Sequence, residues 1–372
     1  MPYNRRIYQS SSLFVGPSGF NATGQHLSLG NSGANLLMQI SRVQSINDGF
    51  DLPRQNVSQY GQLAPLSREI TDSPTVNLSF SYYPTDGLDE KKLGFVTSGS
   101  GTSGALTNIL RNISDERNYF IPTVAEGEDG VGSAFGAVTD VRAVGNAFIS
   151  SYSVEGSVGG FLSSSVSVEG INAKYALGGS GNGIPAIDPT NGALVTGWQY
   201  VIPTATSGTA NQPIVIKQGD ITVDFTAVDA LGARLTGVGG AHIQSFNINV
   251  PIGREALNKL GNRFAFAREI TFPVDVSLSI NALVNDLNSG SLSSLFCNDR
   301  AYDINVFCRT QTCSAAQGSN LLVYTLRGAQ LDSQSFGGSI GPGQTVDMNF
   351  TSSVGGPGDT RRNFYISGSN QG

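Results

Sequence analysis

Charged residues are scarce in this chain of 372 residues: Asp, Glu, Lys and Arg make up 13%, roughly half the share of an ordinary soluble domain. The formal net charge is −6, so no basic footprint for wrapping nucleic acid is present. No run of apolar residues approaches the length of a membrane helix, and the first residues lack the apolar core of a signal peptide. A surface rich in Ser, Gly, Asn and Thr suits a chain buried among partners better than a free cytosolic enzyme.

Residues that bind metals or form cross-links are also few. The three cysteines are Cys297, Cys308 and Cys313, an odd number in one region, which is not a disulfide framework and fits a reduced compartment. The two histidines, His26 and His242, lie far from the cysteines in sequence, so no zinc-site spacing is formed. We expect no metal and no cofactor.

Acidic residues cluster at 86–90 and 126–129, but without the spacing of a calcium loop, and we expect both clusters to be solvated turns. A GxGxxG match at Gly99, Gly101 and Gly104 precedes a helical pattern, as in a dinucleotide site. However, no alternation of strands and helices surrounds this match. A chain with 47 glycines contains such matches by chance, so we interpret the segment as a flexible loop. No nucleophile has a credible base. We therefore expect a protein that is not an enzyme.

An internal repeat organises the chain. The 38 residues that begin at position 43 align without a gap with the 38 that begin at position 243, and 12 positions are identical. The match resumes further on, where Gly156-Ser-Val-Gly aligns with Gly338-Ser-Ile-Gly and Arg117-Asn-Tyr with Arg300-Ala-Tyr. The offset falls from 200 to 183 residues, so the first copy holds 17 extra residues between 81 and 116. We predict two homologous domains, residues 1–205 (copy one) and 206–372 (copy two), joined by a stretch rich in Pro and Gly.

Both copies show a period-two alternation of apolar and polar residues. It is strict over 75–82, 165–168, 275–280 and 345–350, and clusters of Gly, Asn and Pro separate these runs. Such runs are typical of half-buried antiparallel strands. Helical periodicity is brief, at 105–113 and 282–287. The sequence predicts an all-β protein of two tandem sandwich or barrel domains, each with one short flanking helix.

The repeat also selects candidate assembly residues, because the duplication kept them in both copies. Neighbouring residues of a strand face opposite sides, so the two residues of Arg68-Glu69, like those of Arg268-Glu269, cannot form a salt bridge with each other. One member of each pair therefore faces another strand or another subunit. The alternative is an ordinary surface pair worth less than about 1 kcal/mol. The long segments 48–67 and 249–267 join two strands in each copy, and each contains an arginine and a glycine at matching positions. The candidates are Arg54, Gly61, Arg68, Glu69, Arg254, Gly261, Arg268 and Glu269.

A series of short motifs resembles the tail tube proteins of long-tailed bacteriophages, over most of copy one and more loosely over copy two. The resemblance is carried by Asn146-Ala-Phe-Ile-Ser-Ser-Tyr-Ser-Val, Gly156-Ser-Val-Gly-Gly-Phe, Val166-Ser-Val-Glu-Gly, Leu52-Pro-Arg, the strand 76–82, Leu93-Gly-Phe and Arg117-Asn-Tyr-Phe-Ile. The family has no catalytic residues to carry over.

The resemblance implies a sandwich flanked by a helix, six of which close into a ring by joining sheet edges. Rings stack into a hollow tube, assembled in the host cytoplasm, through which DNA passes without specific binding. In this family a long loop at the place of segments 48–67 and 249–267 reaches the neighbouring ring; the alternative is that Arg54 and Arg254 only cap a local turn. The duplication then implies three chains per ring, with other tail proteins as further partners and the virion tail as location.

Charge separates the copies: copy one has 11 basic and 16 acidic groups, copy two 11 and 12. An acidic bore would repel phosphates, and we expect its charge to alternate around the ring. Two alternatives stay open. A capsid-type shell protein shares edge pairing and low charge, and a carbohydrate-binding adhesin shares the composition but usually displays tryptophans, of which this chain has one, Trp198.

Overall fold

A computed structural model describes residues 10–17, 37–97, 103–111, 116–125, 128–131, 138–188, 192–195, 199–206, 215–225, 242–283, 301–310, 318–338, 344–356, 359 and 363–369. The fold is all-β, as the alternation predicts. In copy one the elements are β1 (Leu13–Pro17), β2 (Met38–Ile40), β3 (Val43–Asp51), β4 (Arg54–Val57), β5 (Ser67–Ile70), β6 (Thr75–Tyr82), α1 (Leu88–Leu93), α2 (Thr107–Leu110), β7 (Arg117–Val124), β8 (Val138–Ser157), β9 (Ser163–Gly170), β10 (Asn172–Leu177), β11 (Ser180–Gly183) and β12 (Gln199–Val201). In copy two they are a 3-10 turn (Gln218–Asp220), β13 (Ile221–Phe225), β14 (His242–Pro251), β15 (Arg254–Leu257), β16 (Ala267–Ile270), β17 (Val274–Leu283), β18 (Tyr302–Arg309), β19 (Asn320–Gly337), β20 (Thr345–Val354) and β21 (Asn363–Gly368).

Strand β8 belongs to both sheets of copy one. Its first half pairs with β7 and β10, and its second half pairs with β9, which continues through β6 to β3. A bulge between Ile149 and Ser151 marks the passage from one sheet to the other. The two layers enclose apolar side chains from alternate positions of each strand.

Copy two repeats this topology. Strand β19 takes the place of β8: its first half pairs with β18 and β21, and its second half pairs with β20, which continues through β17 to β14. The bulge recurs between Leu331 and Ser333. Another bulge, between Val43 and Ser45 in β3, recurs between Ile243 and Ser245 in β14. These shared bulges give residue-by-residue counterparts between the copies, whereas the domain boundary at 205/206 stays a prediction.

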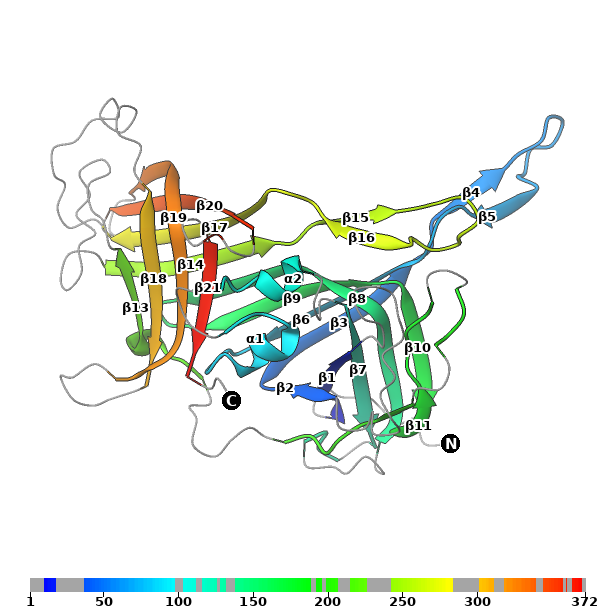
Figure 1. Cartoon of the computed structure of the whole chain (residues 1–372), viewed down its shortest axis with the longest axis horizontal. Helices are drawn as coiled ribbons and strands as arrows, with labels where there is room; N and C mark the ends of the chain where they lie inside the picture. Colours follow the sequence, from blue (N-terminus) through cyan, green and yellow to red (C-terminus); the bar gives the residue numbers. More distant parts are fainter. Residues whose placement is uncertain are drawn as a thin grey trace.

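The two copies are joined through one sheet (Figure 1). Strand β14 pairs with the outer side of β8, so eight strands run in the order β3-β6-β9-β8-β14-β17-β20-β19. One cluster of buried apolar residues extends through both copies, from Val76 and Val154 to Val250 and Met348. The chain therefore folds as one body in which copy two extends the sheet of copy one.

The helices differ from the expectation of one per copy. In copy one the expected helix at 105–113 is the shorter α2, and α1 was not foreseen. In copy two the expected helix begins with Ala282 and Leu283, which instead end β17 because both pair with β14 and β20; residues 284–287 lie outside the described residues.

The segment inserted in copy one lies against β21 of copy two. The Ala105 amide donates to the Phe364 carbonyl at 2.7 Å, and the Gly368 amide donates to the Thr97 carbonyl at 3.2 Å. A Cβ on Gly87, whose φ is +81°, would lie 2.9 Å from the Gly368 Cα. The insertion thus covers the outer edge of the second copy within one chain.

Candidate assembly surface

The joint between the copies is a ladder of seven residue pairs between β8 and β14. It runs from Ser157 opposite Ser245 to Ser151 opposite Pro251. Three of the pairs point into the core, and two of them consist of apolar side chains on both strands: Tyr152 with Val250, and Val154 with Ile248. All four side chains are buried, so the joint is part of the hydrophobic core.

The counterparts of these two strands form open edges. Strand β3 corresponds to β14, and residues 330–337 of β19 correspond to the second half of β8. Among the described residues, β3 pairs only with β6, and this part of β19 pairs only with β20. Each end of the eight-stranded sheet therefore presents half of the joint that the middle of the sheet contains.

Exposed phenylalanines mark the two open edges. Phe50 in β3 corresponds to Val250, and Phe336 in β19 corresponds to Val154. Phe50 is 58% and Phe336 55% exposed, whereas both valines are 0% exposed. Positions that hold buried core residues in the joint thus hold solvent-exposed apolar residues at the open edges.

A glycine allows the close contact at the end of the joint. Gly156 in β8 lies opposite Phe246, and a Cβ on it would come 2.5 Å from the ring. The sequence alignment places Gly338 at the same position of copy two. Among the described residues, a Cβ on Gly338 would approach only the Gln344 Cγ, at 3.5 Å, and no described strand covers that edge.

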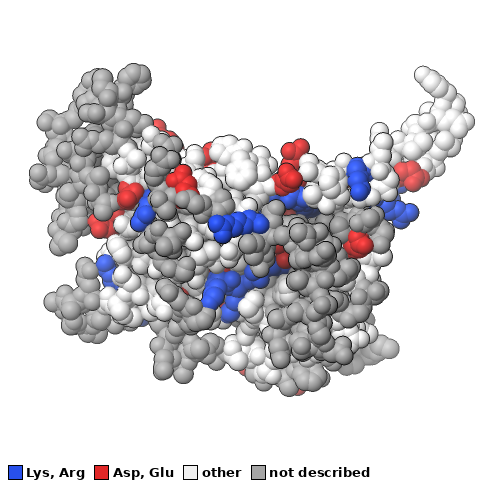
Figure 2. All heavy atoms as spheres, viewed as in Figure 1, with Lys and Arg blue, Asp and Glu red and all other residues white. Residues whose placement is uncertain are grey.

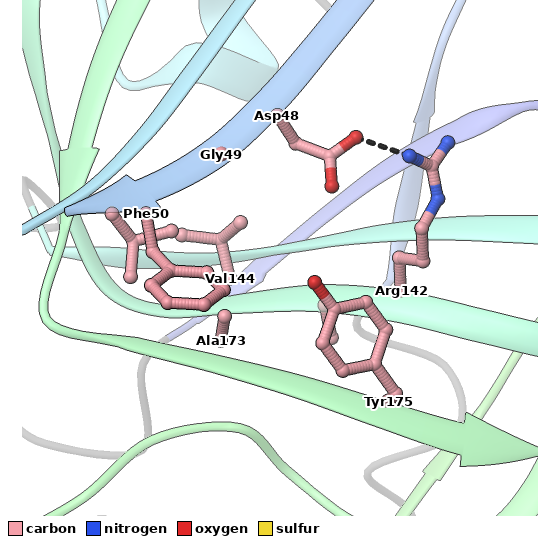
Figure 3. A pocket seen from close by; sticks show the side chains of 9 residues that line it. Asp48, Gly49, Phe50, Arg142, Val144, Ala173 and Tyr175 are labelled. Atoms are coloured by element: carbon pink, nitrogen blue, oxygen red, sulfur yellow. Dashed lines mark hydrogen bonds and ion pairs between the residues drawn. The ribbon is translucent and has the colours of Figure 1, made fainter.

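The open side of β3 borders a small pocket (Figure 3). Asp48 forms an ion pair with Arg142 of β8 there, and the rings of Phe50 and Tyr175 flank it. Copy two has Ile248 in place of Asp48, inside the core. An inward-facing charge on an edge strand is a common means of discouraging indiscriminate pairing.

Two hairpins, β4–β5 and β15–β16, extend from corresponding places in the copies; we call them the first arm (residues 54–70) and the second arm (residues 254–270). They carry all eight candidate residues. The second arm lies across copy one (Figure 1). The Arg254 guanidinium lies 4.6 Å above the centre of the Phe148 ring, and the Arg268 Nη1 lies 4.0 Å from the Glu169 Oε2. Burial lowers the pKa of Arg268, and Glu169 opposes that shift.

The first arm projects away from the body, and its residues 54–66 and 68–70 are exposed, Arg54, Arg68 and Glu69 among them. Gly61 and Gly261 occupy the tips with φ near +85° and +91°, a conformation that glycine adopts without strain. Glu69 faces Gln55 across its hairpin, and Glu269 faces Glu255. The structure therefore brings Arg254 and Arg268 against the other copy and leaves Arg54 and Arg68 in solvent.

The outward face of the eight-stranded sheet is polar and carries no Lys or Arg within the strand segments themselves. Cross-strand hydrogen bonds link its hydroxyls, amides and carboxylates, such as Ser45 to Ser81 at 2.7 Å and Ser353 to Asp275 at 2.6 Å. Its acids are Asp51, Glu155 and Glu169 in copy one and Asp275, Asp332 and Asp347 in copy two. Each copy contributes three of these acids, and the alternation of charge expected for a bore stays a prediction. On the molecular face in Figure 2, charges are sparse and the two signs interspersed.

A buried carboxyl lies where the copies meet inside the core. Glu90 of α1 accepts hydrogen bonds from the hydroxyls of Tyr82 at 2.9 Å and Tyr152 at 3.2 Å. Burial, with repulsion from Asp89, raises the pKa of Glu90 to about 7. The expectation of a solvated turn at 86–90 is wrong, because Asp86, Asp89 and Glu90 are buried. The closeness of the acids to Leu88 and Leu93 is the only sequence signal of this burial.

The remaining motifs are only partly described. Several residues of these motifs lie outside the described residues: 99–102 of the GxGxxG match, Cys297, Cys313, His26 and Trp198. Gly104 packs against Asn363, where a Cβ would be 2.3 Å from the side chain. Cys308 is a buried free thiol, and burial raises its pKa. In the described part of the chain, no three or more His, Cys, Asp or Glu are grouped to hold a metal, and no helix is long and apolar enough to cross a membrane.

Comparison with known proteins gives no matching family model and no matching curated protein. Two solved structures align weakly. A chain of the virion of the native gene transfer agent particle is 12% identical, covers 41% of this chain and 98% of its own, and has a TM-score of 0.21. A chain of the anti-feeding prophage baseplate, in its sixfold-symmetrised cryo-EM structure, is 12% identical, covers 40% and 92%, and also has a TM-score of 0.21. Such scores do not establish a shared fold.

Proposed function

We propose that this protein is a structural phage protein, the major subunit of a tail tube. Three chains close into a pseudo-hexameric ring, and rings stack into a hollow conduit for DNA in the virion tail, together with other tail proteins. The number three comes from the sequence resemblance to rings of six domains, with two domains in each chain.

The observation that carries the proposal is the joint between β8 and β14 together with its two open counterparts. A sheet that has β3 exposed at one end and β19 at the other can add a second chain in the way that it already joins its own two copies. Such a contact is head-to-tail, and it forms a closed ring when the rotation between copies is a simple fraction of a turn.

The joint also supplies the register of the contact. Transferring the pairs of β8 and β14 onto their counterparts sets Ser333 of one chain opposite Asp51 of the next, Gln334 opposite Phe50, and Phe336 opposite Asp48. Phe50 and Phe336 become diagonal neighbours on the core side. Ring closure would thereby bury both exposed rings.

The outward face of the sheet suits the lining of a conduit. Hydroxyls, amides and carboxylates on its strands bond with one another, and the acids repel phosphate groups. DNA would then pass along this face without specific binding sites.

Negative-stain electron microscopy of the concentrated chain tests the proposal. We expect hollow rings or tubes with threefold symmetry. Closed shells would instead assign a capsid-type role. A chain that stays monomeric at every concentration and binds glycans in an array would assign the adhesin role.

A further inference from the structure

The second arm shows how an arm of this chain docks on a neighbouring copy. Arg254 and Arg268 lie above Phe148 and Glu169, which face each other as a residue pair between β8 and β9. Ile252, just before the arm, is fully buried, and its amide donates to the Ser150 carbonyl at the β8 bulge. The base of the arm is thus fixed by the joint, and the two arginines meet the strands beyond it.

The first arm has the same internal structure as the second. The Arg54 Nη1 donates to the Arg68 carbonyl at 3.2 Å, and the Arg254 Nη1 donates to the Arg268 carbonyl at 3.3 Å. At both arms the strand after the hairpin also returns a backbone bond to the segment before it, from Thr71 to Pro53 and from Thr271 to Gly253. The first arm could therefore dock on a neighbouring copy in the same geometry as the second arm, without a change in its own structure.

The docking site transfers as well. The pair in copy two that corresponds to Phe148 and Glu169 is Gln330 and Thr351, between β19 and β20. Thr351 lacks a charge, but its hydroxyl bonds to the carboxylate of Asp332, the bulged residue of β19. A carboxylate therefore lies close to the place that Glu169 occupies in copy one.

We propose that the first arm of one chain docks on β19 and β20 of a second copy of this chain, where Arg68 forms an ion pair with Asp332. The inference rests on the proposed ring, because the open edges of β3 and β19 must meet for the arm to reach this site. The Arg68–Asp332 pair reproduces between chains the contact that Arg268 and Glu169 make within one.

Exposure and charge favour a second copy as the occupant. Val57 and Ile70 of the first arm are exposed, while Leu257 and Ile270 of the second arm are half-buried. The site is continuous with the open edge of β19, and its acid matches the cation on the arm. The same chain thus presents both halves of the contact.

Charge reversal tests the pair. The full chain is studied with Arg68→Glu, with Asp332→Arg, and with both changes together. Asp347→Arg serves as a matched control, since it makes the same charge change on the same face of copy two, away from the arm. Assembly is followed by sedimentation and electron microscopy over a concentration series, and thermal unfolding of the dilute chain shows that each variant folds.

We expect each single reversal to raise the concentration needed for assembly about tenfold, because an attraction becomes a repulsion at every contact between chains. The double variant should return to within about threefold of wild type, and Asp347→Arg should assemble as wild type does. Single variants that assemble normally, a double variant as weak as the singles, or an equal loss in Asp347→Arg would each overturn the ion pair and leave the ring intact. A wild-type chain that never forms rings would overturn the ring and the ion pair together.

Discussion

Tyr152 and Tyr324 meet hydroxyl to hydroxyl at 3.2 Å, although 172 residues separate them in the chain. Tyr152 comes from copy one, Tyr324 from copy two, and both are buried. The Tyr152 hydroxyl also reaches Glu90, so a polar network crosses the boundary between the copies inside the core. Removing Tyr152 would take this partner from the Tyr324 hydroxyl in an apolar surrounding, while Glu90 would keep its bond to Tyr82.

Glu90 predicts a pH dependence of stability. Its pKa is about 7 in the folded chain against 4.5 for the free side chain, so the folded state holds its proton more tightly than the unfolded state does. The free energy of unfolding should therefore fall by about 3 kcal/mol as the pH rises from 4.5 through 7, and Glu90→Gln should abolish this fall. Urea unfolding between pH 4.5 and 8 measures it, with Glu155→Gln on the outward face as control. Parallel profiles for wild type and Glu90→Gln would contradict the assignment.

Equivalent glycines should respond differently to one substitution. Gly156→Val places a side chain against the Phe246 ring in the intact joint and should cost about 1–3 kcal/mol of folding free energy. Gly338→Val has room in the single chain, so its stability should match wild type, while assembly should weaken because the proposed contact sets Ile46 of the next chain opposite. Denaturant unfolding and sedimentation separate the two effects. Equal destabilisation of both variants would show that the edge at Gly338 is already covered in the single chain.

The same comparison applies to the apolar residues of the joint. Val154→Ser puts a hydroxyl into the core and should cost about 3 kcal/mol. Phe336→Ser, at the counterpart position, should change the stability of the single chain by less than about 0.5 kcal/mol and reduce tube formation. The measurement is unfolding of the dilute chain followed by microscopy of the concentrated one. Normal tubes from Phe336→Ser would remove this edge from the contact.

Engineered cysteines test the register between chains. The pair of Ser153 and Asn249 in the joint corresponds to Ser335 of one chain and Gly49 of the next. Directly opposed residues of antiparallel strands are close enough for a disulfide, so Ser335→Cys with Gly49→Cys should yield covalent dimers and trimers on oxidation. Ser335→Cys with Ser45→Cys, four residues out of register, is the control. Denaturing gels read the outcome, and equal cross-linking of both pairs would refute the register.

The tip of the first arm is predicted to contact the next ring. Tyr60 and Leu63 at the tip are fully exposed. Replacing residues 58–66 with Asn-Gly keeps a two-residue hairpin and should leave a folded, soluble chain that forms rings but no long tubes. The same replacement of 258–266 should destabilise the chain itself, since Phe264 packs on Gly192 and Ala265 is buried. Normal elongation after the first deletion would exclude the tip from stacking.

The alternation of apolar and polar residues predicted four strands from the sequence, because β6, β9, β17 and β20 each have one buried and one polar face. The first half of β8 is nearly continuously buried, so its sequence shows no alternation of apolar and polar residues. The length of β8 and its passage from one sheet to the other could therefore not be predicted. The arms were foreseen as long connections that lead into strands at Arg68-Glu69 and Arg268-Glu269. The partner strands β4 and β15 were missed; in β4 every residue is exposed, so no alternation marks it. The eight candidate residues came from the duplication alone, whereas Asp48, Phe50, Asp332 and Phe336 were missed, since only the paired bulges reveal which edges correspond.

The covalent union of β8 and β14 in one chain has a kinetic consequence for assembly. Folding brings these two edges together at the high effective concentration of a tethered pair, so half of the contacts in a ring of three chains no longer depend on protein concentration. Ring nucleation would then scale with the third power of subunit concentration, where six separate domains would require the sixth. Elongation would also advance by whole pairs of domains, so a partly filled ring has only two intermediate states.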